Sequence, residues 1–214
     1  MSDAHYFKSR RNRVWREGER VYKKYGQLPG ENTGGPLRRA AYEADMLTYL
    51  HCCGVPVPKV YSCAYDLLVM EYIDGITLAD FIEQNEAATP KMEAGRLARE
   101  ILHWFDAFYS AMQKGSIRGD VNCRNFLIMQ HGNIVGVDFE TAHSGYREKD
   151  LGRLMAYILT YRPEYTPYKI ELSDLLLEGF TAHFGLNPKL AILEKGWELD
   201  AMNDRRVSSH FGSL

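Results

Sequence analysis

The sequence predicts an α+β protein with a small strand-rich N-terminal part and a larger, mainly helical C-terminal part. Up to Asp74 short alternating apolar runs dominate, a pattern typical of antiparallel strands, with a single helical segment among them. From Gly75 onward apolar residues mostly recur every three to four positions, which is typical of helices. We therefore expect two lobes, residues 1–74 and residues 75–214.

The composition is that of an ordinary globular protein, with 45% hydrophobic and 25% charged residues among 214. It excludes disorder as the default state. The net charge of −2 argues against a protein whose whole surface is built to hold nucleic acid. The sequence contains no apolar run of membrane-span length and no signal-peptide core, so we expect a cytoplasmic protein without a membrane span. The four cysteines fit no metal-binding spacing, and we expect buried thiols.

The N-terminal part is predicted to contain a hairpin, one helix and two further strands. Gly18 lies at the turn of the hairpin. A polar, glycine-containing loop follows, and Pro36 opens the helix at a position where proline is tolerated. Gly54 ends this helix. In chain order the expected elements are strands 12–15 and 19–25, the loop 27–35, the helix from 36, and strands 60–64 and 67–73.

The C-terminal part is predicted to contain helices and one further hairpin. Thr77 is a capping residue for a short helix through Glu83, and Thr89-Pro90 starts a long helix. Two apolar runs, 125–129 and 134–137, flank a turn and form the hairpin. From Asp150 onward we expect helices, with breaks at Arg162-Pro163, at Gly185 and near Gly196.

One group of polar residues in the C-terminal part has the spacing of a catalytic motif. Asp120 is followed five positions later by Asn125, and Asp138 ends an apolar run thirteen residues further on. An isolated Asp or Asn at the end of a loop usually serves to stabilise a turn. The ordered set of three, however, is an arrangement typical of phosphoryl transfer. A carboxylate there orients and deprotonates an acceptor hydroxyl, and Asp120 fits that role. Oxygen ligands hold Mg²⁺ on the phosphates, and Asn125 and Asp138 fit that role.

The N-terminal part supplies the matching nucleotide-binding residues. Arg20–Tyr25 places a lysine pair on a strand, Glu43 lies in the helix that follows, and residues 68–75 resemble a kinase hinge. The order of lysine, glutamate, hinge, D-x-x-x-x-N and D-F-x resembles the protein-kinase-like superfamily over residues ~14 to ~160. The resemblance implies a bilobal fold and ATP with Mg²⁺ as cofactors. It also implies that Glu43 orients the phosphate-binding lysine and that the hinge backbone, around Glu71 and Ile73, meets the adenine.

The resemblance also bears on which lysine holds the phosphates. Kinase strands turn this lysine, and the residue two before it, toward the nucleotide and bury the residue just before it. For Lys23 the buried residue is Tyr22, whereas for Lys24 it is the charged Lys23. A buried unpaired charge is costly. We therefore assign Lys23 and place Lys24 on the solvent side.

Details of the motifs point to a compact branch of the superfamily. Asp138-Phe139-Glu140 and Gly119 before Asp120 resemble aminoglycoside phosphotransferases and choline kinases. Asp150 follows Asp138 by only twelve positions, which leaves no room for an ordinary activation loop. The compact relatives are small-molecule phosphotransferases, lipopolysaccharide-sugar kinases, RIO kinases and the small kinase of the KEOPS complex.

Three departures from the family pattern stand out. Arg118 occupies the position of the histidine in H-G-D, and no glycine-rich phosphate loop precedes Lys23. Arg124 lies just before Asn125, where it could meet the γ-phosphate or the acceptor as a catalytic cation; a salt bridge within the loop explains it equally well. The basic N-terminal segment is either a contact for an anionic acceptor such as nucleic acid or, as we favour, a solvated strand edge. Its basic residues are Lys8, Arg10, Arg11, Arg13 and Arg16.

The sequence thus predicts an ATP- and Mg²⁺-dependent phosphotransferase with a hydroxyl acceptor, which we expect to be a small molecule rather than a protein. A nucleotide-binding pseudokinase or scaffold is the alternative that the missing glycine-rich loop suggests. An atypical serine/threonine protein kinase is a second alternative.

Overall fold

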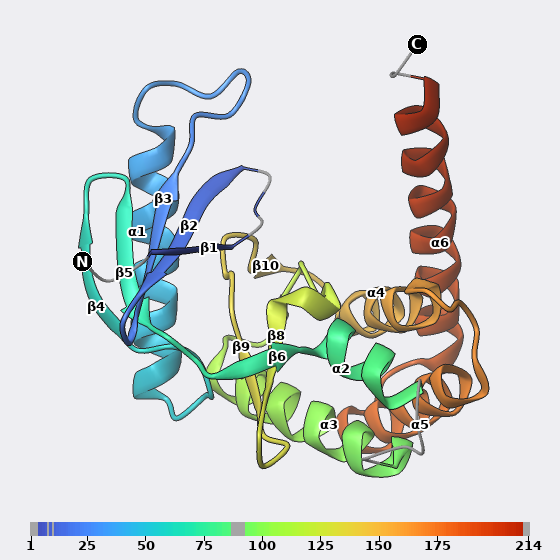
Figure 1. Ribbon diagram of the computed structural model, residues 1–214. Helices are drawn as coiled ribbons and strands as arrows, with labels where there is room; N and C mark the ends of the chain where they lie inside the picture. Colours follow the sequence, from blue (N-terminus) through green and yellow to red (C-terminus); the bar gives the residue numbers. More distant parts are fainter. Residues whose placement is uncertain (1–3, 8, 10, 87–92, 212–214) are drawn as a thin grey trace. The chain divides into compact units, whose positions relative to one another are not determined.

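A computed structural model describes residues 4–7, 9, 11–86 and 93–211 of the chain (Figure 1). The chain divides into two compact units. The first comprises Met1–Gly75 together with Val135–Glu140, and the second comprises Ile76–Ile134 and Thr141–Leu214. The sequence-based division at Asp74–Gly75 places residues 135–140 in the C-terminal part. In the structure these residues, which include Asp138, belong to the first unit.

The first unit is built on a five-stranded antiparallel sheet in the order β1-β2-β3-β5-β4 (Figure 1). The β2–β3 hairpin closes at the pair Glu17 and Arg20, so its turn is the dipeptide Gly18-Glu19. Gly18 has φ +58°, which glycine adopts without strain. The strands are β1 (His5–Phe7), β2 (Asn12–Glu17), β3 (Arg20–Tyr25), β4 (Val60–Ala64) and β5 (Leu67–Glu71).

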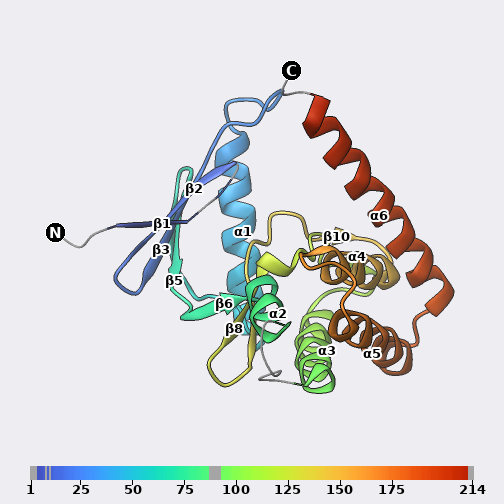
Figure 2. The ribbon, with the colours of Figure 1, turned by 45° about the vertical axis from the view of Figure 1, so that its right-hand side comes forward.

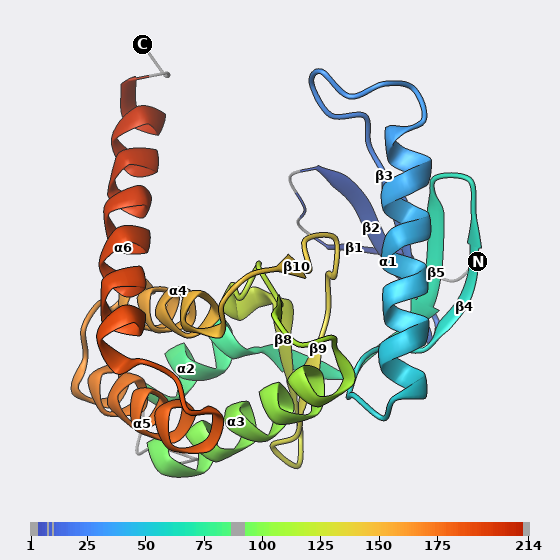
Figure 3. The same cartoon turned by 180° about the vertical axis from the view of Figure 1, so that it is seen from behind.

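Helix α1 (Gly35–Cys52) packs against β3, β4 and β5 of this sheet (Figure 3). Proline lies in its first turn, where a missing N–H costs no helical hydrogen bond. Its buried side chains recur every three or four residues and face the sheet. They are Ala40, Glu43, Ala44, Leu47 and Leu50. Gly54, with φ +79°, follows the helix.

The register of β3 corrects one sequence-based expectation. Lys23 and Tyr25 point to the face that α1 covers and are buried, at 5% and 2% exposure. Tyr22, which we expected to be buried, is only half-buried on the opposite face, where its ring stacks on Trp15 at 5.2 Å. The expectation failed because it treated a charged side chain as the outward one, whereas carboxylates compensate the buried charge of Lys23.

The second unit is mainly helical. Helix α3 packs against α5, and α4 packs against α6 (Figure 2). An aromatic cluster fills its core. The centre of the Trp104 ring lies 5.1–5.5 Å from the ring centres of Phe105, Phe108 and Phe126. The helices are α2 (Leu78–Glu86), α3 (Ala94–Ala111), α4 (Arg147–Thr160), α5 (Pro167–Phe184) and α6 (Pro188–Phe211).

Short strands lie between the helices along the rest of the chain. The two-residue strands β7 (Ser116–Ile117) and β10 (His143–Ser144) pair antiparallel. Strands β8 (Phe126–Met129) and β9 (Ile134–Gly136) flank the expected turn, in which the Met129 N–H donates to the Asn133 carbonyl at 3.0 Å. Strand β6 (Gly75–Thr77) precedes α2, and its Thr77 hydroxyl caps that helix by accepting the Asp80 N–H at 3.1 Å.

Several expected helix limits differ from the structure. The predicted break near Gly196 is wrong, because α6 runs through this residue and a single helical glycine costs only about 1 kcal/mol relative to alanine. Helix α4 begins at Arg147 rather than at Asp150. The expected start of the long helix at Thr89-Pro90 lies outside the described residues, and the described helix begins at Ala94.

The cysteines correct a further expectation. Cys123 is buried, but Cys52, Cys53 and Cys63 are exposed free thiols. The first two lie at the end of α1 beyond its packed stripe, and Cys63 lies on β4, an edge strand of the sheet. Among the described residues, no helix has the length and apolar character that crossing a membrane requires.

Candidate active site

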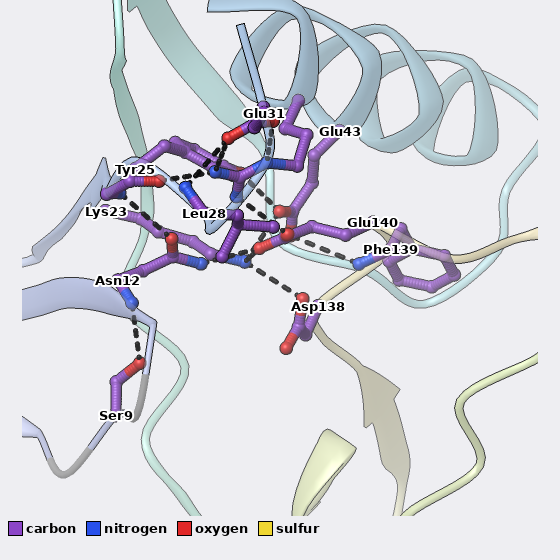
Figure 4. Close-up of polar contacts among 12 residues, drawn as sticks. Ser9, Asn12, Lys23, Tyr25, Leu28, Glu31, Glu43, Asp138, Phe139 and Glu140 are labelled. Carbon is purple, nitrogen blue, oxygen red and sulfur yellow. Dashed lines mark hydrogen bonds and ion pairs between the residues drawn. The ribbon is translucent and has the colours of Figure 1, made fainter. Parts of the chain in front are cut away.

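In the first unit a buried lysine lies among three carboxylates (Figure 4). Lys23 Nζ on β3 donates to Glu43 Oε2 on α1 at 2.6 Å. It also lies 2.9 Å from Asp138 Oδ1 and 2.8 Å from Glu140 Oε1. The side chain of Lys23 is 6% exposed and that of Glu43 is fully buried. The structure therefore brings together Lys23, Glu43 and Asp138, three residues that are far apart in the sequence.

Opposing effects set the charge states of this cluster. Burial lowers the pKa of Lys23, but the charges of Glu43, Asp138 and Glu140 outweigh it and raise the pKa above its usual range. Burial raises the pKa of Glu43, and Lys23 counteracts that rise. The Tyr25 hydroxyl donates to Glu43 as well. The ammonium group of Lys23 is thus protonated. The buried carboxylate of Glu43 depends on its hydrogen-bond partners to remain ionised.

The segment around Asp138 is anchored on α1. The Phe139 N–H donates to Glu43 Oε1 at 3.1 Å, and the Phe139 side chain is fully buried. Asp138 has φ +64°, a left-handed conformation that is uncommon for residues other than glycine. Such strain persists where the surroundings enforce it, and it often marks a functional position. The result is a buried ring next to a carboxylate that remains 44% exposed.

Glu140 is a member of the cluster that the sequence analysis did not assign to the site. The Asn12 amide donates to its Oε1 at 2.6 Å, and Arg39 NH1 lies 3.2 Å from its Oε2. Arg39 is in turn bonded to Glu31 at 3.0 Å. An acidic residue two positions after Asp138 was the available signal, but it served only as a mark of the family. Asn12 and Arg39 carry no sequence pattern that would connect them to this site.

The other residues expected near the nucleotide lie on β3 and at the end of β5. Lys24 has a side chain that is 56% exposed and lies 3.9 Å from Asp66. The Glu71 N–H donates to the Lys59 carbonyl at 2.8 Å. Ile73 follows β5 in an irregular segment, and its N–H has no hydrogen-bond partner among the described residues.

The second unit contains the loop with Asp120. The preceding residue, Gly119, has φ +80°, and a Cβ there would lie 2.5 Å from the Thr141 carbonyl oxygen, so only glycine fits. Asp150 on α4 accepts the backbone N–H groups of Arg118 and Gly119 at 2.7 and 2.9 Å. The buried Asp150 therefore fixes the backbone immediately before Asp120. Burial raises the pKa of this carboxyl, and the two backbone donors counteract that rise.

Arg118, which stands in place of the expected histidine, is fully buried. Its guanidinium lies 5.8 Å from the centre of the Phe126 ring, within the range of a cation–π interaction. Arg118 thus packs into the core beneath the loop.

Asn125 and Arg124 lie on a three-residue 3₁₀ turn, η1 (Cys123–Asn125). The Asn125 side-chain amide donates to the Asp120 carbonyl at 3.4 Å, which ties the two ends of the motif together. Arg124 is 58% exposed, and its NH1 lies 3.5 Å from Asp80 Oδ1 on α2. The salt bridge considered for Arg124 is therefore present, although it reaches α2 rather than another loop residue. Asp120, Arg124 and Asn125 belong to the second unit, and Lys23, Glu43 and Asp138 to the first.

Residues 40–161, more than half of the chain, match the model of the ABC1 atypical kinase-like domain. The chain belongs to the ABC1 atypical kinase-like domain family. The matched range includes Glu43 and Asp120 through Asp150 and begins after Lys23. The resemblance to the protein-kinase-like superfamily is thereby confirmed, and so is the expected α+β fold class.

Two curated proteins are similar to this ABC1-family chain. A probable serine/threonine-protein kinase BUD32 homolog from Archaeoglobus fulgidus is 27% identical over 165 residues, 77% of this chain and 75% of the relative. The EKC/KEOPS complex subunit BUD32 of Encephalitozoon cuniculi is 26% identical over 151 residues, 68% of this chain and 70% of that protein.

A solved structure resembles the fold. The choline/ethanolamine kinase family protein from Mesorhizobium loti matches with a TM-score of 0.50, covering 83% of this chain and 70% of that one. At 17% identity the likeness concerns the fold alone.

The donor set of this ABC1-family member fits a hard cation. Oxygen atoms of Glu43, Asp138 and Glu140 lie within 4.8 Å of one another, and carboxylate oxygens are the ligands that Mg²⁺ prefers. Glu43 already receives hydrogen bonds on both oxygens, from Lys23 and Phe139 among others. Asp138 is the most exposed of the three. The first unit therefore offers a metal ligand in Asp138, with Glu140 next to it.

Proposed function

We propose that the protein is an ATP- and Mg²⁺-dependent phosphotransferase that moves the γ-phosphate to a hydroxyl acceptor. The observation that carries the proposal is the buried Lys23–Glu43 pair with Asp138 on the same ammonium group. In the proposal Lys23 holds the α- and β-phosphates, and Glu43 keeps Lys23 in place. The backbone at Glu71 and Ile73 meets the adenine, since the N–H of Ile73 is available to it.

The remaining roles belong to the acceptor and the metal. Asp120 orients the acceptor hydroxyl and takes its proton as the oxygen attacks the γ-phosphorus. The bond between that phosphorus and the bridging oxygen breaks, and ADP leaves with the electron pair. Asn125 and Asp138 are the proposed Mg²⁺ ligands. Bound Mg²⁺ would supply charge neutralisation on the phosphates. Arg124 is proposed as a cation for the transferred phosphate or the acceptor.

We propose a small-molecule acceptor. Asp150 follows Asp138 by only twelve positions, which leaves no room for the segment with which regulated protein kinases position a peptide. The alternative acceptor is a serine or threonine of a protein, and the name of the Archaeoglobus relative favours it. A third possibility, nucleotide binding without transfer, follows from the two-residue turn at Gly18-Glu19, which is short for a phosphate cover.

The test compares Mg²⁺-dependent turnover of γ-labelled ATP in the wild type and in Asp120→Asn and Asp138→Asn proteins. Each substitution keeps side-chain size, and we expect each to lower turnover by a factor on the order of 10² or more. Asp106→Asn is the matched control, because Asp106 is an exposed carboxylate paired with His183 on the helical surface. Normal turnover in Asp138→Asn would refute the assignment.

The same samples separate the three candidate functions. Label appearing on sugars or amino alcohols supports the small-molecule acceptor. Label appearing on protein serine or threonine, with none on small molecules, supports the protein kinase. Mg²⁺-dependent ATP binding without any transfer supports the nucleotide-binding alternative.

A further inference from the structure

Asn122 is the hub of the loop that carries Asp120 and Asn125. Its backbone N–H donates to Asp120 Oδ1 at 3.2 Å, and its carbonyl accepts the Asn125 N–H at 2.8 Å. Its side-chain Oδ1 accepts the Arg124 N–H at 2.9 Å and thereby caps the η1 turn. A turn of three residues has little cohesion of its own, because it makes few internal hydrogen bonds. Its geometry therefore depends on where the Asn122 side chain is held.

Tyr161 holds that side chain from the C-terminal end of α4. The Tyr161 hydroxyl donates to Asn122 Oδ1 at 2.7 Å, the same oxygen that caps the turn. The Arg124 guanidinium lies 5.7 Å from the centre of the Tyr161 ring, which is a second link to the turn. One side chain thus contacts both the cap and a residue of the turn.

A buried ion pair fixes Tyr161 in turn. Lys169 on α5 is fully buried, and its ammonium group donates to the Tyr161 carbonyl at 2.7 Å and to the Pro163 carbonyl. Glu86 Oε2 lies 3.1 Å from the same ammonium group. Breaking a buried pair of this kind is costly, so the connection between α4 and α5 has a well-defined position. The connection is the fixed point from which Tyr161 reaches the loop.

We propose that Tyr161 is a positioning residue for phosphoryl transfer, acting through Asn122 on Asp120 and Asn125. The inference rests on the proposed function for its effect on turnover, but its structural part stands independently of that function. Tyr161 does not supply a chemical group to the reaction. It sets the orientation of the loop that supplies the catalytic carboxylate and a metal ligand.

Tyr161→Phe tests the proposal by removing the hydroxyl and keeping the ring. Tyr168→Phe is the matched control, because Tyr168 is a half-buried tyrosine on α5 whose hydroxyl accepts from Asn85 of α2, away from the loop. The first readout is hydrogen exchange at the Arg124 amide. We expect exchange to quicken roughly fivefold in Tyr161→Phe, the factor that corresponds to one net hydrogen bond, and to stay unchanged in the control.

The second readout is steady-state ATP turnover as a function of Mg²⁺. In Tyr161→Phe we expect kcat to fall and half-saturating Mg²⁺ to rise, each roughly fivefold, with KM for ATP unchanged. A merely structural role would lower stability without moving the Mg²⁺ requirement. The third readout is a double substitution: in an Asn122→Ala background, Tyr161→Phe should have no further effect on exchange or turnover, because Tyr161 acts through Asn122.

The outcomes separate the two proposals. Unchanged exchange at Arg124 in Tyr161→Phe overturns the positioning role whatever the activity. An unchanged Mg²⁺ requirement in an active Tyr161→Phe enzyme, or additive effects in the double variant, overturns it as well. Faster exchange together with a wild type that transfers no phosphate supports the hold of Tyr161 on the loop and overturns the proposed function instead.

Discussion

Replacing Lys23 by methionine removes the cation that lies among Glu43, Asp138 and Glu140 while keeping most of the side-chain volume. The cost falls unequally on the three carboxylates. Asp138 is 44% exposed and can be solvated, and Glu140 retains Asn12 and Arg39. Glu43 is fully buried and loses its counter-charge. Removing one partner of a buried pair costs about 3–5 kcal/mol, and we expect the lower end, about 3 kcal/mol, because other donors to Glu43 remain.

The loss should depend on pH with a definite sign. Burial raises the pKa of Glu43 and Lys23 opposes that rise, so loss of Lys23 raises the pKa further. Above the unfolded pKa of about 4.5 the folded variant then holds a proton that the unfolded chain has released, and its stability falls as pH rises. One proton corresponds to about 1.4 kcal/mol per pH unit, so a deficit of about 3 kcal/mol develops over about two pH units. Near pH 4.5 the deficit should be small.

Urea denaturation at pH 5 and pH 8, followed by circular dichroism, measures the difference in unfolding free energy. Lys24→Met is the matched control. The side chain of this neighbouring lysine is 56% exposed, and its ion pair with Asp66 is long at 3.9 Å. It should change stability by no more than about 0.5 kcal/mol at either pH. Equal effects of the two substitutions, or a deficit in Lys23→Met that does not grow with pH, would refute the account of a buried counter-charge.

Three further predictions concern the second unit. Gly196→Ala should stabilise the protein by about 0.5–1 kcal/mol in thermal denaturation, since an added Cβ meets nothing within 4 Å; a lowered melting temperature would contradict this. Asp150→Asn should cost about 2 kcal/mol in urea denaturation, because an amide group then faces the donors from Arg118 and Gly119; an unchanged midpoint would contradict it. Three thiols should react with a disulfide reagent in the native protein, and Cys123, whose thiol pKa burial raises, only after unfolding; a count of four in the native state would rule this out.

Local patterns predicted most of the fold. The hairpin around Gly18, the helix from Pro36 and the capped helix after Thr77 depend on turn, proline and capping chemistry within a few residues. Gly196 misled the prediction because the tertiary packing of α6 overrides one unfavourable residue. The burial of the β3 residues could not be derived locally either, since it depends on which face of the sheet α1 covers.

The candidate site was predictable where its residues have fixed spacing. Asp120 and Asn125 are five residues apart on one loop. The period of a strand did not by itself select Lys23, because that argument required Tyr22 to be the buried residue, whereas Lys23 is buried and Tyr22 is half-buried. The partners of Glu140 were not predictable, because Asn12 and Arg39 lie more than a hundred residues away along the chain. Tyr161 was missed for a similar reason. Its link to Asn122 spans 39 residues and follows no sequence period.

The three carboxylates around Lys23 differ in exposure, and this indicates different roles for them. The Glu43 side chain is 0% exposed, that of Glu140 13% and that of Asp138 44%. Glu43 cannot leave Lys23 without remaining a buried charge, so its part in the cluster is to hold the lysine. Asp138 can leave at little cost, because water or a cation can replace the ammonium group. Glu140 can leave as well, because Arg39 and Asn12 still bind it. In the proposed function, a polyphosphate that binds Lys23 would therefore displace Asp138 and Glu140 from the ammonium group and leave Glu43 in place, so that Asp138 is available for its proposed role as an Mg²⁺ ligand.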